Sequence, residues 1–186
     1  MRNIGKFFGL LSLLAFFTFP ALAQGPSVDV FGGYEYLHWG LSSGHLNMNG
    51  GEGAATLNLI PWLGLTADIS GEYNNNGANG TTHLYTYLFG PTVYPLGHHK
   101  FTPFVHGLAG YGHVNVDIPG AGTLTDSGFT YALGAGLDWK LIPHISLRLV
   151  QGDYEQTRFF SGILSGAGFS GTQKSTRIAT GVVIHF

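Results

Sequence analysis

Residues 63–73 read Leu-Gly-Leu-Thr-Ala-Asp-Ile-Ser-Gly-Glu-Tyr. Apolar and polar side chains alternate along this stretch with a period of two, which is the spacing that a β-strand gives to its two faces. One face carries Leu63, Leu65, Ala67, Ile69 and Tyr73, and the other carries Gly64, Thr66, Asp68, Ser70 and Glu72. The stretch therefore predicts a strand that lies between an apolar and a polar environment.

The same alternation recurs at 129–139 and at the end of the chain, at 177–186. Less regular segments bring the expected number of strands to eight. We expect them at 27–38, 51–59, 63–73, 83–94, 102–114, 129–139, 145–154 and 177–186. Their lengths are close to the roughly 9–11 residues with which a tilted strand crosses a bilayer.

Short and long connections alternate between these segments. The short ones, at 60–62, 95–100 and 140–144, each contain proline, and the long ones, at 39–50, 74–82, 115–128 and 155–175, are polar and rich in Gly, Asn or Ser. Short turns at one rim and long loops at the other are typical of outer-membrane barrels. The predicted fold is all-β: one domain at 24–186, folded as an eight-stranded, antiparallel, up-and-down transmembrane β-barrel.

The composition is unusual for a soluble protein. Only 10% of the residues are charged, against about 25% in an average globular protein. After residue 23 no segment reaches the roughly 18 apolar residues of a membrane helix. The chain has no cysteine, which excludes stabilisation by disulfides.

The first 23 residues have the features of a signal peptide. Arg2 and Lys6 precede an apolar stretch at 7–19, and small residues follow at 21–23. The apolar stretch is too short for a membrane helix, so we expect Sec export and cleavage before Gln24; an uncleaved anchor is the alternative. The mature chain would carry six Lys and Arg against ten Asp and Glu, which gives no reason to expect a nucleic-acid partner.

A soluble lipocalin-like barrel also has eight strands, but it would place apolar residues inside and charges outside. The apolar faces here would then have to be covered, because a soluble protein rarely exposes such a belt. We expect the following residues to face lipid: Leu65, Ile69, Tyr131, Leu137, Val182 and Ile184. Five aromatic residues are expected near the two membrane interfaces: Trp39, Trp62, Tyr94, Trp139 and Phe186.

Several segments resemble the OmpA-type and opacity-type small outer-membrane barrels. They are Phe89-Gly-Pro-Thr-Val-Tyr-Pro95, Thr102-Pro-Phe-Val-His-Gly-Leu-Ala-Gly110, Gly152-Asp-Tyr154 and the last ten residues. The resemblance implies a bacterial outer-membrane location in contact with the lipid bilayer. It also implies that the barrel-assembly machinery recognises the last strand through its alternating apolar residues and final aromatic, namely Ile178, Val182, Ile184 and Phe186.

Six charged residues are expected to form a structural charge network in the lumen: Glu35, Asp68, Glu72, Asp138, Arg148 and Arg177. A turn centred on Pro143 would place Asp138 opposite Arg148, and closure of the last strand on the first would bring Arg177 to the height of Glu35. Eight strands enclose an interior just wide enough for side chains, so these charges should pair. Lumenal glycines fit this narrow space, and we expect them at Gly110, Gly112, Gly134, Gly136, Gly152 and Gly181.

Two catalytic or metal-binding interpretations remain as alternatives. His45, His83 and His113 fall near the long-loop rim, but their spacing matches no known ligand pattern. His144-Ile145-Ser146 has the His-x-Ser spacing of outer-membrane lipid A deacylases. However, its place at the short-turn rim is opposite to the leaflet that holds lipid A.

The sequence thus predicts an outer-membrane barrel of structural or surface-interaction type, adhesin-like or opacity-like. We expect neither catalysis nor a cofactor, and an extracellular ligand is possible at the long loops, which a rigid scaffold would present. The alternatives are a lipid A-modifying enzyme and a conduit for small hydrophobic molecules.

Overall fold

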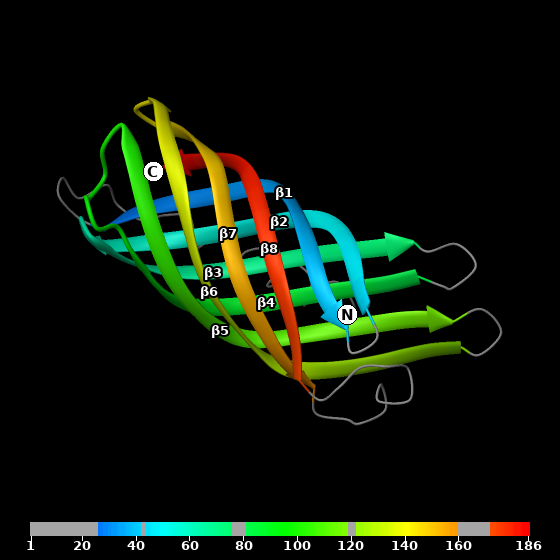
Figure 1. The fold of residues 1–186 in the computed structure, drawn as a ribbon. Helices are drawn as coiled ribbons and strands as arrows, with labels where there is room; N and C mark the ends of the chain where they lie inside the picture. The colour runs from blue at the N-terminus through cyan, green and yellow to red at the C-terminus, as the bar shows by residue number, and fades with distance from the viewer. Residues whose placement is uncertain (1–25, 42–43, 76–80, 119–121, 160–171) are drawn as a thin grey trace, which may run out of the picture.

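The computed structural model describes residues 26–41, 44–75, 81–118, 122–159 and 172–186; the expected signal peptide lies outside this part of the chain. Eight strands follow one another: β1 Ser27–Leu41, β2 Gly44–Ile60, β3 Leu63–Asn75, β4 Thr81–Val93, β5 Phe101–Ile118, β6 Gly122–Ile142, β7 Ile145–Phe159 and β8 Thr172–His185. Consecutive strands pair antiparallel, and Figure 1 shows them tilted and coiled around one interior. Within the described ranges no helix is long and apolar enough to span a bilayer.

The first and last strands close the barrel. Their register runs from Asp29 opposite His185 to Gly40 opposite Lys174. Beyond the last strand, Phe186 N donates to Val28 O at 2.9 Å. The predicted closed, eight-stranded topology is therefore confirmed, and closure gives each described strand two hydrogen-bonded neighbours, as a barrel in lipid requires.

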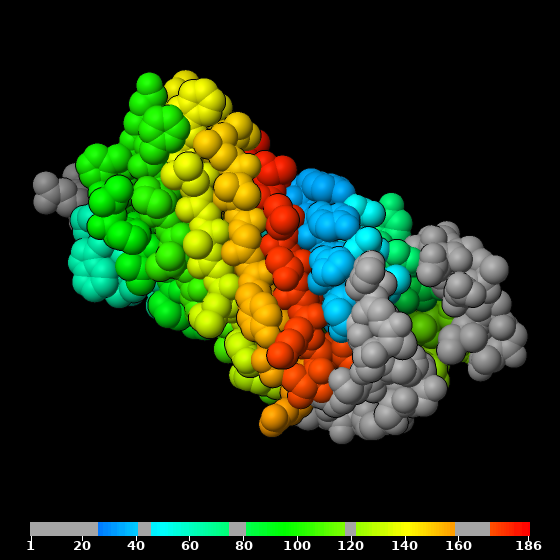
Figure 2. All heavy atoms as spheres, in the orientation of Figure 1, coloured from blue at the N-terminus to red at the C-terminus, as the bar shows by residue number. Residues whose placement is uncertain are grey.

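The side chains sort as the alternation predicts. Ile69 is 56% exposed, whereas its neighbour Asp68 is 2% exposed. The other residues expected to face lipid (Leu65, Tyr131, Leu137, Val182 and Ile184) are half-buried or exposed on the outside, and the six expected lumenal charges are buried. Figure 2 shows side chains of β6, β7, β8 and β1 as parallel stripes on one outer face. The soluble arrangement, with charges outside, is thereby excluded for this fold.

The strands are longer than predicted at the long-loop end. β6 has 21 residues and β5 has 18, and the two pair as far as Ile118 opposite Gly122. The predicted loops at 39–50 and 115–128 are therefore wrong: nearly all of these residues belong to hairpins. Their outward faces are polar, as in the bond from Thr125 Oγ1 to Asn115 Oδ1 at 2.8 Å, so the apolar–polar alternation that marks the membrane-facing part of a strand is missing there.

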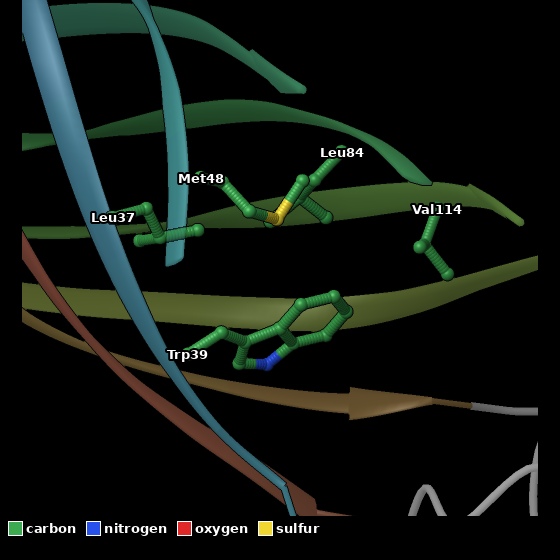
Figure 3. Close-up of a cluster of buried hydrophobic side chains, with 5 residues drawn as sticks. All are labelled: Leu37, Trp39, Met48, Leu84 and Val114. Carbon is green, nitrogen blue, oxygen red and sulfur yellow. The ribbon is translucent and has the colours of Figure 1, made fainter. Parts of the chain in front are cut away.

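The interior at this end is apolar. Leu37, Trp39, Met48, Leu84 and Val114 form one buried cluster, which Figure 3 shows between β1, β2, β4 and β5. The prediction that Trp39 lies at a membrane interface is wrong. Trp39 follows Glu35 and Leu37 on the face of β1 that points into the lumen. The cluster fills the barrel beneath the long connections.

Tyr94 also departs from its predicted position at a membrane interface. It follows β4, is buried, and lies with its ring centroid 6.4 Å from that of Phe104, inside the short-turn end. The other three aromatics remain on the surface: Trp62 and Phe186 are exposed, and Trp139 stacks on Phe101 with ring centroids 6.2 Å apart.

A β-bulge reverses the faces of β7 at its centre. The pairing with β6 steps from Leu137–Val150 to Asp138–Arg148, so that Leu149 and Val150 both point outward. Beyond the bulge, Gln151, Asp153 and Glu155 are the buried residues. Gly152, expected in the lumen, consequently faces outward, because one extra residue shifts all later side chains to the opposite face.

Candidate functional site: the charged interior

Arg177 stands at the centre of the lumenal charges. It projects from β8, and its Nε donates to Asp153 Oδ2 at 2.9 Å. The nitrogen NH1 lies 3.3 Å from Asp68 Oδ1, 3.5 Å from Glu155 Oε1 and 3.9 Å from Glu35 Oε2. One fully buried guanidinium is thus shared among four carboxyl groups.

The register of Arg177 differs slightly from the prediction. Its cross-strand partner on β1 is Leu37, while Glu35 lies opposite Ala179. The two charges are therefore two residues apart in height, and they approach each other only because the arginine side chain is long. This explains why the distance to Glu35 is the longest of the four.

Arg148 forms a second, separate centre nearer the short turns. Its Nε and NH2 atoms donate to the two carboxylate oxygens of Asp138 at 2.8 and 3.1 Å, so the expected cross-strand ion pair is present in bidentate form. The guanidinium also lies between two aromatic rings, 4.2 Å from the centroid of Phe31 and 4.3 Å from that of Phe104.

Gln151 and Asp153 connect the two centres. Gln151 accepts from Arg148 NH1 at 2.6 Å and donates from Nε2 to Glu52 Oε1 at 2.9 Å and to Asp153 Oδ2 at 2.8 Å. Asp153 also contacts His106 Nε2 at 2.6 Å. The two arginine centres are therefore parts of one continuous polar network.

Sequence reasoning missed Glu52, Asp153 and Glu155 as members of this network. For the two residues of β7, the signal was available in the adjacent apolar pair Leu149-Val150, which interrupts the alternation. Without a bulge there, Asp153 and Glu155 would face lipid at high energetic cost. For Glu52 the polar and glycine-rich start of the predicted strand at 51–59 offered no such contrast.

The network surrounds only a small free space near Arg148. The cavity lined by Asp29, Glu52, Tyr94 and Arg148, among others, is only about 10 Å³, close to the smallest volume that holds one water molecule. Such an interior does not support the alternative of a conduit for small hydrophobic molecules.

A second cluster lies at the short-turn rim. Ser146 Oγ is 2.7 Å from His185 Nε2, and His185 Nδ1 is 2.6 Å from Asp29 Oδ1. Asp29 in turn accepts from Asn58 Nδ2 at 2.8 Å. This chain of bonds, here called the rim clasp (Ser146, His185, Asp29 and Asn58), links β7, β8, β1 and β2.

The rim clasp changes the interpretation of the His-x-Ser motif. Ser146 pairs with His185 and not with His144, whose Nδ1 lies 3.3 Å from the backbone oxygen of His185. A Ser–His–Asp order is the one that serine hydrolases use, but here Ser146 is 3% exposed.

The nearby ring of His98 lies 4.4 Å from that of Tyr94, and desolvation there lowers the pKa of His98.

The histidines near the long connections remain apart. His113 Nδ1 bonds to Ser127 Oγ at 2.7 Å and His38 Nδ1 to Asn47 Oδ1 at 2.7 Å, while the side chain of His45 is outside the described part. Across the residues whose positions are given, no three His, Asp or Glu side chains are grouped so that they could hold a metal ion.

A closed antiparallel barrel with an apolar exterior and a charged interior defines a small outer-membrane β-barrel protein. A family model described as "Outer membrane protein beta-barrel domain" matches residues 9–186. The chain belongs to that family. No curated protein sequence matches it significantly.

Solved structures with this fold share little sequence with the chain. Neisserial surface protein A has a TM-score of 0.67 at 14% identity, with 86% of this chain and 97% of that chain covered. The attachment invasion locus protein Ail of Yersinia pestis, in complex with the heparin analogue sucrose octasulfate, has a TM-score of 0.60 at 15% identity, with 88% and 100% covered. The N-terminal barrel of Pseudomonas aeruginosa OprF has a TM-score of 0.50 at 13% identity, with 87% and 98% covered.

Proposed function

We propose that this protein is a β-barrel of the bacterial outer membrane that binds a ligand at the cell surface, and that the binding site lies at its extracellular end. The observation that carries the proposal is the filled interior: an apolar cluster and a charge network leave a cavity of only about 10 Å³. Long hairpins, above all β5–β6, extend the barrel beyond the length that crosses a bilayer. A rigid scaffold of this kind favours binding by the connections that it carries.

The two similar barrels with the higher TM-scores support this proposal by their own descriptions. One is a surface protein, and the other is an attachment protein that binds a heparin analogue. At 14–15% identity the likeness extends to the fold, so the ligand of this chain has to be found by experiment.

The test is binding by the purified barrel in phospholipid nanodiscs to arrays of polysaccharides, including heparin, and of extracellular matrix proteins. In the matched variant, residues 117–123 at the end of the β5–β6 hairpin are replaced by a short Gly-Ser turn. We expect the native protein to bind at least one class of probe and the variant to lose most of that binding. Binding by neither protein, or equal binding by both, would contradict the proposal.

We further propose export through the Sec pathway and insertion by the barrel-assembly machinery. Ile178, Val182, Ile184 and Phe186 are all exposed on the outer face of β8 and the residue after it, where an assembly factor could read them. The lipid bilayer then covers the same residues in the finished barrel.

An acyl hydrolase is the second candidate, favoured by the Ser146–His185–Asp29 geometry alone. Catalysis requires that the serine be reachable by substrate, and Ser146 is almost completely buried. We therefore expect a fluorophosphonate probe to leave the barrel unlabelled in phosphatidylethanolamine vesicles. Labelling of the native protein that Ser146→Ala and His185→Ala both abolish would establish the hydrolase instead.

A further inference from the structure

The interior holds far more acid than base. Nine of the ten Asp and Glu residues of the chain are buried in the barrel, and only Asp117 is exposed. Two arginines, Arg148 and Arg177, are the buried permanent cations among the described residues. Unpaired buried carboxylates are too costly for a stable fold, so the missing positive charge has to be supplied in another form.

Several carboxylate oxygens in this interior have no hydrogen-bond donor. They are both oxygens of Glu35 and one oxygen each of Glu52, Glu72 and Glu155. Glu35 has no exposed surface at all, and its nearest cation, Arg177, is 3.9 Å away. An ionised carboxylate would normally accept bonds at these positions.

Two of these side chains lie at the same height in the barrel. Glu35 of β1 and Glu72 of β3 share one rung with Gly50 of β2, which lies opposite both of them. Gly50 has no side chain to separate the two acids, and a Cβ there would collide with the backbone oxygen of Gly71. Both side chains are buried in the lumen at this height, and no side chain of β2 stands between them.

A second pair lies one step lower. Glu52 of β2 lies opposite Ser70 of β3, so that it is two residues from Asp68 along the same lumenal face. Glu52 already accepts from Gln151 through Oε1, and Glu72 already accepts from Ser70 through Oε1. In each residue the remaining Oε2 atom is the one without a donor.

The titratable and charged groups that line this interior come from every strand except β4, which presents the uncharged Thr86 beside Ser70. They are Asp29 and Glu35 of β1, Glu52 of β2, Asp68 and Glu72 of β3, His106 of β5, Asp126 and Asp138 of β6, Arg148, Asp153 and Glu155 of β7, and Arg177 and His185 of β8; Tyr94, directly after β4, is also buried here. Asp138 and Asp153 accept hydrogen bonds from Arg148 and Arg177, whereas the carboxyl oxygens without a donor include those of Glu35, Glu52 and Glu72.

We propose that Glu35 and Glu52 are neutral carboxylic acids at neutral pH, donating hydrogen bonds to Glu72 and Asp68, so that the folded barrel holds two protons that the unfolded chain releases. These two protons supply part of the positive charge that the two buried arginines do not provide. A proton needs only two oxygens, whereas a metal ion needs several, and among the described residues no three His, Asp or Glu side chains are grouped so that they could hold a metal ion.

The sign of the pH dependence follows directly. An unfolded Glu loses its proton near a pKa of about 4.3, while the folded pairs keep theirs. Stability falls with pH wherever the folded state binds more protons than the unfolded state. Each retained proton should raise the unfolding equilibrium constant about tenfold per pH unit until the pair ionises.

The test compares the native barrel with Glu35→Gln, which keeps the shape and a donor but cannot ionise. Urea unfolding in phosphatidylcholine vesicles is measured from pH 6 to pH 9. We expect Glu35→Gln to reduce the pH dependence of the unfolding equilibrium by the equivalent of one proton. The variant should also be at least as stable as the native protein at pH 8. Glu52→Gln should act in the same way, and Asp117→Asn, the exposed control, should leave the slope unchanged.

Infrared spectroscopy gives an independent readout at neutral pH, because a protonated carboxyl has its own carbonyl band. This band should be present in the native barrel and weaker in Glu35→Gln. Unchanged slopes in both glutamine variants, or absence of the band, would overturn the proposal. Stabilisation by added Ca²⁺ that Glu35→Gln abolishes would also overturn it, because a metal ion would then occupy the site.

Discussion

Asp138→Ala and Arg148→Ala should each destabilise the barrel by about 3 kcal/mol, because removing one member of a buried ion pair leaves its partner uncompensated. The pair is buried on both sides and is bidentate. Arg148→Ala should be the more harmful change, since it also removes the cation from between Phe31 and Phe104. The double variant should cost clearly less than the sum of the two single changes.

Urea unfolding in lipid vesicles measures these differences. The control is the combination of Asp117→Ala with Arg158→Ala, two exposed residues of β5 and β7, which should change stability by less than about 0.5 kcal/mol. Purely additive costs for Asp138 and Arg148 would show that the contact contributes no coupling energy, contrary to the geometry described above.

Replacement of Arg177 should have the largest effect of any single substitution in the lumen. Arg177→Met keeps much of the side-chain volume but leaves Asp68, Asp153 and Glu155 without their shared cation. We expect a loss of about 4–5 kcal/mol at pH 8, at the upper end for a broken buried pair. The loss should shrink at pH 5, because the orphaned carboxyl groups can then take up protons.

Unfolding of Arg177→Met at the two pH values checks this expectation, with Arg158→Met as the matched control on the outer surface. If the variant does not refold at pH 8, refolding at pH 5 measures the same rescue. A loss that is equal at both pH values would contradict the role of Arg177 as the charge that neutralises these acids.

The strongest signal in the sequence was the strict alternation of apolar and polar residues at 63–73. It was sufficient to predict a barrel, because few folds combine an apolar outer surface with a polar interior. The ion pair of Asp138 and Arg148 was equally accessible, since Pro143 lies five residues from each of them. Both inferences depend on local geometry: the period of a strand and the symmetry of a tight turn.

The features that could not be predicted from the sequence mostly depend on contacts between residues far apart in the chain. The bulge at Leu149 and Val150 places Asp153 and Glu155 in the lumen, and the only trace of it in the sequence is the break in alternation at those two apolar residues. Trp39 and Tyr94 point inward because the lumen-facing positions of their strands continue beyond the strand ends that the sequence predicted. Arg177 lies within reach of Asp68, 109 residues earlier, and only the closed barrel brings those two residues together.

The rim clasp has a consequence for the order of folding. Its bond between Asp29 and His185 joins residues 156 positions apart, nearly the whole described chain. Contacts of such long range are slow to form, because the intervening chain must lose its freedom before they can stabilise anything. Strands that are neighbours in the sequence can pair one hairpin at a time. The pairing of β1 with β8, however, forms only after the last residues of the chain have joined the sheet. The clasp is therefore a late-forming contact, and substitutions in it should change the unfolding rate more than the folding rate.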